Sequence, residues 1–171
     1  MPIEFDVNLK VKDMFRFNMH QTYTGFSGFL SILSSVLLFG MAIYTYEKVT
    51  LTYTVLYVFF GVILLVYQPL TLWLRAKQSI KVSPVLSNTL HYMVNEDGFT
   101  VTQGEANGVL AWKQIYKMVA TKKLVLVYSN RIHAYVIPRE QLGEYYVPLA
   151  KLARTKLPKY RLKMKVTIKD V

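Results

Sequence analysis

The chain has 171 residues, 53% of them hydrophobic, and 21 Lys+Arg against 10 Asp+Glu give a formal net charge of +11. Its mean hydropathy of +0.25 is high for a water-soluble protein, and this length suits one ordinary domain or a small domain joined to membrane segments. The sequence contains no cysteine, which excludes disulfides, thiolate nucleophiles and cysteine-based metal sites.

The N-terminal segment, residues 1–17, opens with a strict alternation of apolar and polar side chains. In "IEFDVNLKVK" every second residue from Ile3 to Val11 is apolar, and a period of two is typical of a half-buried strand. We predict a strand over residues 3–12 that joins the sheet formed further along the chain. This opening is partly acidic and has no small-residue cleavage pattern, so we expect the first apolar segment to be retained.

Two apolar stretches follow, over residues 26–46 and 53–74. Between Arg16 and Arg75 the only charged residues are Glu47 and Lys48, and each stretch reaches the roughly 20 residues that a membrane-spanning helix needs. We predict a transmembrane hairpin over residues 26–74. The alternative is a pair of buried core helices in a soluble protein, but so short a chain could hardly cover both on every side.

Basic residues flank the predicted hairpin on the same side. Three precede the first span and three follow the second, whereas the turn carries Lys48 alone. Basic flanks favour the cytoplasmic side, so we predict a multi-pass protein of the cell membrane with both termini in the cytoplasm. The six flanking residues are Lys10, Lys12, Arg16, Arg75, Lys77 and Lys81.

Small side chains recur within the predicted spans. They let helix backbones approach closely in lipid, which leaves two interpretations open. Either the two spans of one chain pack on each other there, or the small residues form a docking face for another membrane protein or a second copy. The candidate docking residues are Ser27, Gly28, Ser31, Ser35 and Gly61.

Residues 75–171 are typical of a small cytoplasmic α+β domain. The "EDG" at 96–98 lies between two alternating stretches and predicts a hairpin, and "GEANG" (104–108) and "SNR" (129–131) mark further turns. Apolar residues then recur at helical intervals from Leu142 to Leu157. We predict an antiparallel sheet capped by this C-terminal helix. A last, strongly basic strand is expected over residues 160–169, and it could pair with the N-terminal strand.

The segment from Glu96 to Glu140 resembles the C-terminal domain of YcxB-like bacterial membrane proteins. The resemblance covers about residues 88–157, and the two upstream spans match the layout of that family. It implies a fold similar to pleckstrin-homology domains, and it brings no catalytic residues. Arg139, where lysine is commoner, and the basic tail depart from the pattern. The motif residues are Asp97–Phe99, Trp112, Ile115, Val119, Leu124–Tyr128 and Ile137–Arg139.

The ionisable residues form no recognisable catalytic or metal-binding pattern. His20, His91 and His133 are far apart in the sequence and lack the spacing of metal ligands. Glu140 and Glu144 suit the start of a helix. We therefore expect no enzyme activity, no cofactor and no metal. Trp112 could serve as a ligand platform, but the interpretation that it fills the sheet core is favoured.

Basic residues after the second span form a candidate contact for anionic lipid. Nucleic acid is a lesser alternative, because a tethered β-domain without a recognition helix fits it poorly, and we expect no nucleic-acid partner. The candidate lipid-contact residues are Arg75, Lys77, Lys151, Arg154, Lys156, Lys159, Arg161, Lys163 and Lys165.

Together these patterns predict a non-catalytic interaction or accessory module held in the bilayer. Its partner would be a transporter, another membrane complex or a second copy. The alternative is a sensor that binds anionic lipid or a small ligand through the basic face of its cytoplasmic domain.

Overall fold

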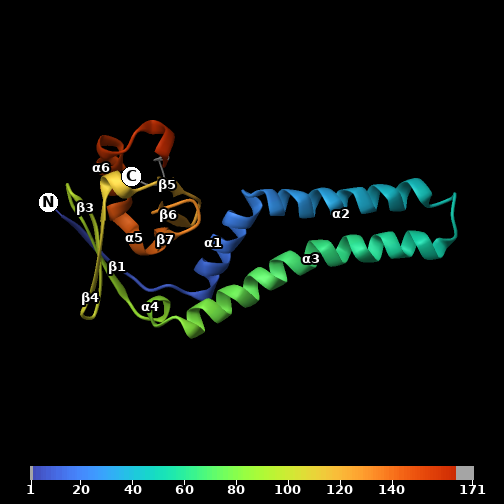
Figure 1. Ribbon diagram of the computed structural model, residues 1–171, viewed down its shortest axis with the longest axis horizontal. Coiled ribbons are helices and arrows are strands. Elements are labelled where there is room, and N and C mark those ends of the chain that lie inside the picture. Colours follow the sequence, from blue (N-terminus) through green and yellow to red (C-terminus); the bar gives the residue numbers. More distant parts are fainter. Residues whose placement is uncertain (1, 165–171) are drawn as a thin grey trace. The chain divides into compact units, whose positions relative to one another are not determined.

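The computed structural model describes residues 2–164 and divides the chain into two compact units. The helical unit covers residues 15–78. The sheet unit combines residues 2–14 with the chain from residue 79 onward, so its first strand and its remaining strands lie on opposite sides of the helical unit in the sequence (Figure 1). The class is α+β, as the sequence predicts.

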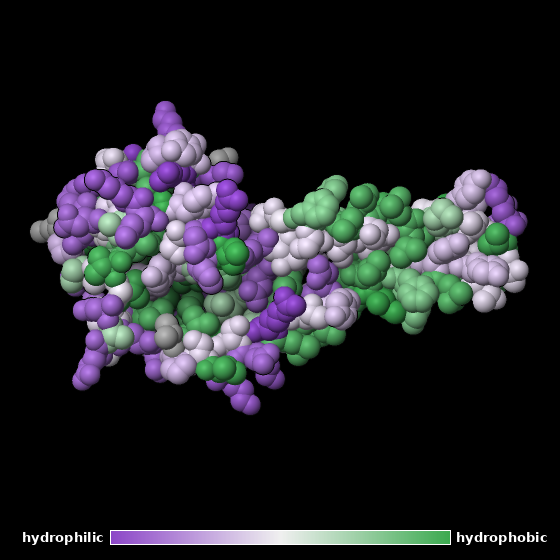
Figure 2. Space-filling view, viewed as in Figure 1, coloured by the Kyte–Doolittle hydropathy of each residue, from purple (hydrophilic) through white to green (hydrophobic). Residues whose placement is uncertain are grey.

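Three helices account for most of the helical unit: α1 (Val11–Tyr23), α2 (Phe26–Thr45) and α3 (Leu51–Val82). Both α2 and α3 are long and apolar enough to span a membrane. Apolar side chains along them are widely exposed, with Phe26 at 78% and Ile43 at 79%. Figure 2 shows hydrophobic surface along both helices and hydrophilic surface at the turn that joins them.

The helix α3 continues past the predicted boundary at residue 74 and ends at Val82. Its last turns are polar, but lysine, glutamine and arginine are good helix formers, so the loss of hydropathy does not end the helix. It stops just before Ser83 and Pro84, where the proline ring disfavours helical geometry in the preceding residue. Pro69 lies inside α3 without ending it.

Buried small residues recur every seven positions on α2 and on α3. On α2 they are Gly28, Ser35 and Ala42, and on α3 they are Thr54 and Gly61. This spacing keeps one seam of each helix turned toward its neighbour. A Cβ atom added at Gly61 would lie 3.1 Å from the Phe39 ring of α2. Packing between the two helices of this chain therefore uses part of the predicted docking face.

The N-terminal strand is shorter than predicted. The strand β1 covers Ile3–Val7, and the helix α1 begins at Val11, where the prediction of strand through residue 12 is wrong. The backbone N–H of Lys10 donates to Asp13 Oδ2 at 3.2 Å, and the backbone N–H of Asp13 donates to the Lys10 carbonyl at 2.9 Å. A carboxylate that caps the first turn stabilises a helix start, and this local signal overrides the alternation.

Four antiparallel strands form sheet A, in the order β1-β2-β3-β4. The strands after β1 are β2 (Leu90–Val94), β3 (Gly98–Gln103) and β4 (Ala106–Ala111). The predicted entry of the N-terminal strand into the sheet is thus confirmed: β1 pairs with β2 from Ile3↔Val94 to Val7↔Leu90.

Sheet B has the order β7-β6-β5-β8. Its strands are β5 (Lys117–Ala120), β6 (Leu124–Tyr128), β7 (Ala134–Pro138) and β8 (Leu162–Lys163). The neighbours β5, β6 and β7 are antiparallel, whereas β8 runs parallel to β5. The predicted strands therefore lie in two sheets, one of them mixed, and all five residues of β6 are buried.

Short helices connect and cover these sheets. They are α4 (Pro84–Ser87), η1 (Trp112–Gln114), α5 (Arg139–Leu142), η2 (Gly143–Tyr145), α6 (Tyr146–Lys156) and η3 (Lys159–Arg161). The predicted C-terminal helix is α6, and Pro148 lies in its first turn, where a missing N–H costs little. Leu149, Ala150 and Ala153 of α6 are fully buried.

The predicted strand over residues 160–169 is confirmed at Leu162–Lys163 and wrong at residues 160–161. Residues 159–161 form the helical turn η3, the strand β8 covers two residues, and it pairs with β5 rather than with β1. Residues 165–169 lie outside the described residues. The acidic side of β1 faces β2 instead, where Asp6 Oδ1 lies 2.7 Å from His91 Nδ1. The alternation of apolar and polar residues predicts that a segment is a strand but does not specify which strand it pairs with. The predicted pairing of the two terminal strands therefore differs from the observed one.

The Phe5 ring anchors β1 in the core. Phe5 is 6% exposed and stacks on Tyr92 with 5.4 Å between ring centroids. We expect Phe5→Ala to lower the free energy of unfolding of the sheet unit by about 3 kcal/mol, because it removes a buried ring and leaves a cavity. Urea unfolding of the full chain in detergent, followed by Trp112 fluorescence in a Trp73→Phe background, measures this loss.

Glu4→Ala is the matched control, because Glu4 is exposed on the same strand and should change stability by less than about 0.5 kcal/mol. Equal effects of the two substitutions would contradict the burial of β1.

The two glycines Gly40 and Gly61 provide a paired test of the seam between α2 and α3. A Cβ atom at Gly61 meets the Phe39 ring, whereas one at Gly40 has no atom within 4 Å. Gly61→Leu should destabilise the helical unit by about 1–3 kcal/mol through overpacking, and Gly40→Leu should not. Loss of far-ultraviolet circular dichroism on titration with dodecyl sulfate gives the comparison. If both variants unfold at the same dodecyl sulfate concentration, the helices do not pack there.

Candidate functional site

The strand β4 forms one edge of sheet A, because its single neighbour among the described strands is β3. Its six residues, Ala106–Ala111, include no charged residue and no proline. Val109 points outward with 72% of its surface exposed. Natural edge strands usually carry lysine, proline or a bulge that prevents pairing with another chain, so this edge is open to a further strand.

The hydrogen-bonding direction of β4 follows from the residue that succeeds it. The backbone N–H of Trp112 donates to the Asp97 carbonyl at 3.2 Å. Backbone groups alternate between facing and leaving the partner strand in an antiparallel ladder. The N–H and C=O groups of Asn107 and Val109 therefore point away from β3, toward the position a fifth strand would occupy.

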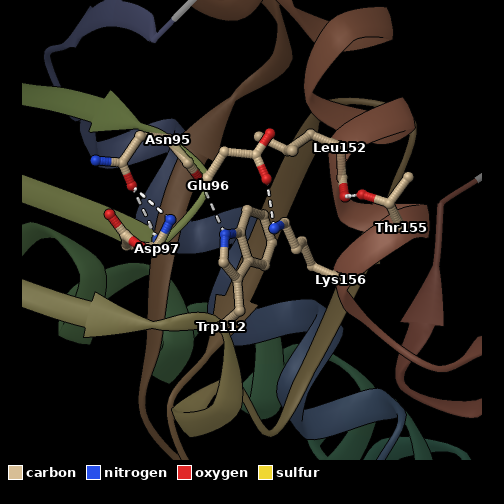
Figure 3. Close-up of polar contacts among 8 residues, drawn as sticks. Asn95, Glu96, Asp97, Trp112, Leu152, Thr155 and Lys156 are labelled. Atoms are coloured by element: carbon tan, nitrogen blue, oxygen red, sulfur yellow. Dashed lines mark hydrogen bonds and ion pairs between the residues drawn. The ribbon is translucent and has the colours of Figure 1, made fainter.

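The turn between β2 and β3 holds the C-terminal end of β4 in place. The Asn95 side chain accepts hydrogen bonds from the backbone N–H groups of Asp97 at 2.9 Å and Gly98 at 3.0 Å, a turn that asparagine favours. A Cβ atom at Gly98 would lie 2.3 Å from the Leu110 carbonyl oxygen. Only glycine fits this approach of β3 to β4. Figure 3 shows the turn beside Trp112.

Trp112 is part of the core. It is 5% exposed, its Nε1–H donates to the Asn95 carbonyl at 2.9 Å, and its ring lies edge-on to Phe99 with 5.2 Å between centroids. A buried indole needs such a partner for its N–H. This placement agrees with the favoured interpretation of Trp112 as a core residue rather than a ligand platform.

The same turn is joined to α6 through an ion pair between Glu96 and Lys156 (Figure 3). The hydrogen bond from Lys156 and its positive charge lower the pKa of Glu96 below its usual value. Lys156, one of the predicted lipid-contact residues, therefore already has an acidic partner.

The other predicted lipid-contact residues come from both units of the chain, and their contact with lipid stays a prediction. Arg75 and Lys77 belong to the helical unit. The side chains of Lys151, Arg154 and Lys159 are exposed. Half-buried Arg161 donates from Nη1 to the Ile115 carbonyl at 3.5 Å. Lys163 is exposed on β8, and Lys165 lies outside the described residues.

The predicted helix-docking residues differ in their exposure and in their contacts. Ser27 is exposed, Ser31 is half-buried, and Ser35 is fully buried and donates to the Ser31 carbonyl at 3.0 Å. A Cβ atom at Gly28 would lie 2.5 Å from the Thr22 carbonyl oxygen. Gly28 is therefore required by the turn that connects α1 to α2. Docking of another protein at these positions stays a prediction.

The fold brings Asp6 to His91, two residues that the sequence keeps far apart. Their side chains are 68% and 44% exposed, and they face each other across β1 and β2. Within the described part of the chain, no three His, Asp or Glu side chains gather as a metal site would require. Glu140 and Glu144 lie in α5 and η2, and Glu140 pairs with Lys123 at 2.9 Å.

These features define a class: an α+β chain in which two helices long and apolar enough to span a membrane separate the first strand of a two-sheet unit from the others. Residues 94–152 match the family model described as YcxB-like protein, so this segment is YcxB-like, as its motifs predict. The match runs from the last residue of β2 into α6 and includes Trp112. The chain matches no curated protein and no solved structure.

The ion pair between Glu96 and Lys156 predicts a small stability difference that depends on pH. Because the folded state lowers the pKa of Glu96 below about 4.5, the pair stabilises the fold above that pH. Its contribution is lost as the pH falls through the lowered value. Glu96→Gln should therefore lower the melting temperature slightly at neutral pH and make no difference well below pH 4.5.

Thermal unfolding of the full chain in detergent at both pH values checks this, with Glu105→Gln as the exposed control on the next turn. A Glu96→Gln effect of the same size at both pH values would contradict the ionic origin.

Proposed function

We propose that this chain is a membrane-anchored, non-catalytic interaction module of a bacterial cell membrane. In this proposal α2 and α3 span the bilayer, the sheet unit is a cytoplasmic domain similar to pleckstrin-homology folds, and a strand of another membrane protein docks on the edge of β4. The uncovered edge of β4 is the observation that carries the proposal.

Membrane anchoring is supported by the surfaces of α2 and α3. Exposed phenylalanine, leucine, isoleucine and valine side chains surround both helices, which would be costly in water and favourable in lipid. Thr45 Oγ1 donates to the Met41 carbonyl at 2.7 Å, which is how a hydroxyl is satisfied in the absence of water.

The pairing of β1 with β2 supports a hairpin with both ends on one side of the bilayer. The strand β1 precedes both spans and β2 follows them, yet their residues pair along five positions. Two strands of one sheet must lie in the same compartment, which requires an even number of crossings. The basic flanks favour the cytoplasm as that compartment.

Docking by strand addition fits β4 better than it fits the opposite edge of sheet A. Just past β1, the Asn8 backbone N–H donates to Gln141 Oε1 at 2.7 Å, and Gln141 Nε2 donates to the Asn8 carbonyl at 2.8 Å. This side-chain amide takes the place of a neighbouring strand. On β4, the outward groups of Asn107 and Val109 offer main-chain affinity to a partner strand.

A photoreactive amino acid in place of Asn107 tests the proposal in native membranes. We expect irradiation to give one discrete heavier product, and its mass distinguishes a second copy from a different protein. Val109→Lys in the same chain should reduce the yield several-fold, because a charge on an edge strand opposes pairing.

Ile132→Lys is the matched control, since Ile132 is 65% exposed in the turn between β6 and β7, away from β4. It should leave the yield unchanged. A product that survives Val109→Lys, or the absence of any product, would refute docking at this edge.

A further inference from the structure

A cavity of about 700 Å³ lies beside sheet B, and its size is within the range of ligand pockets. Its walls come from β5, from the turn after β5, from the start of α5, from Tyr146 of α6 and from β8. Three of its lining residues are cationic: Lys122, Arg139 and Lys163. The described residues that line it include no carboxylate.

Contacts with other residues of the chain hold Arg139 in place. Its backbone N–H donates to the Lys123 carbonyl at 2.9 Å, and its Nη1 donates to the Thr121 carbonyl at 3.3 Å. The guanidinium carbon lies 3.9 Å from the centroid of the Tyr146 ring, which is 3% exposed. Stacking on a buried ring and a carbonyl contact orient the charge before any ligand arrives.

The turn that carries Lys122 is equally constrained. The Thr121 backbone N–H donates to the Leu124 carbonyl at 2.8 Å, and the Leu124 N–H donates to Thr121 Oγ1 at 3.0 Å. The neighbouring Glu140 carboxylate pairs with Lys123 at 2.9 Å, and neither of these two residues lines the cavity.

We propose that this cavity binds a phosphate-bearing anion. A planar guanidinium matches two oxygens of a phosphate, and two lysines on flexible stems add charge around it. The volume exceeds what bare phosphate needs, so the ligand is an organic phosphate, supplied either by a lipid headgroup or by a soluble phosphate ester. The site lies outside β4, and the proposal does not rest on docking there.

The test uses the full chain in detergent. Isothermal titration measures binding of glycerol 1-phosphate and of inorganic phosphate, and native mass spectrometry measures retention of phosphatidylglycerol against an equimolar amount of phosphatidylcholine. If phosphatidylglycerol is retained and no soluble phosphate binds, the ligand is a lipid headgroup. If glycerol 1-phosphate binds saturably, the ligand is a soluble phosphate ester. Either result supports the site.

The double variant Lys122→Gln/Lys163→Gln should weaken the observed binding by about tenfold or more, since it removes two charge-assisted contacts. Arg139→Gln should weaken ligand binding further. Because this substitution also removes the stacking on Tyr146 and so can impair folding, the lysine double variant is the primary test.

Lys113→Gln/Arg131→Gln removes the same charge from exposed positions outside the cavity and should change binding by less than about twofold. The proposal is overturned if no probe binds saturably or is retained selectively. It is equally overturned if the two double variants weaken binding alike, because a diffuse positive surface would then explain the result.

Discussion

The hydrogen bond from Trp112 Nε1 to the Asn95 carbonyl is the contact on which the arrangement of the sheet unit depends. It holds the end of β4 against the turn that begins β3, and the adjacent backbone bond from Trp112 to Asp97 sets which groups of β4 face outward. The polypeptide leaves sheet A for sheet B directly after this residue. A buried indole must satisfy its N–H, and this requirement places the uncovered edge of β4 next to the start of the second sheet.

The two proposed sites, the edge of β4 and the cavity beside sheet B, would provide different kinds of recognition. An uncovered strand presents main-chain groups that any extended segment can match, so its selectivity comes from side chains such as Val109. The cavity presents an oriented guanidinium and two lysines, and it would select ligands that carry negative charge. Because the two lie on different sheets, occupation of one need not prevent occupation of the other.

Local patterns in the sequence predicted the elements well. The apolar stretches correspond to α2 and the first part of α3, the Asp-Gly hairpin forms as expected, and the alternation from Ile3 places β1 in the sheet. Asp13 shows the limit of periodicity, because one capping carboxylate begins a helix inside an alternating pattern.

The candidate sites were harder to predict because they depend on strand order. Nothing local indicates that β4 forms an edge, that β8 runs beside β5, or that a single basic residue after β7 stacks on Tyr146. Lys122 and Arg139 are absent from the predicted lipid contacts because neither lies in a long run of basic residues in the sequence. The fold instead gathers one from each of three separate segments.

The pairing of β1 with β2 also determines the order of events during synthesis. The ribosome releases β1 first, but its partner strand does not exist until both apolar helices have been made and Leu90 has followed them. In that interval the apolar face of β1, including Phe5 and Val7, is unpaired. Sheet A can therefore be completed only after both apolar helices have been synthesised.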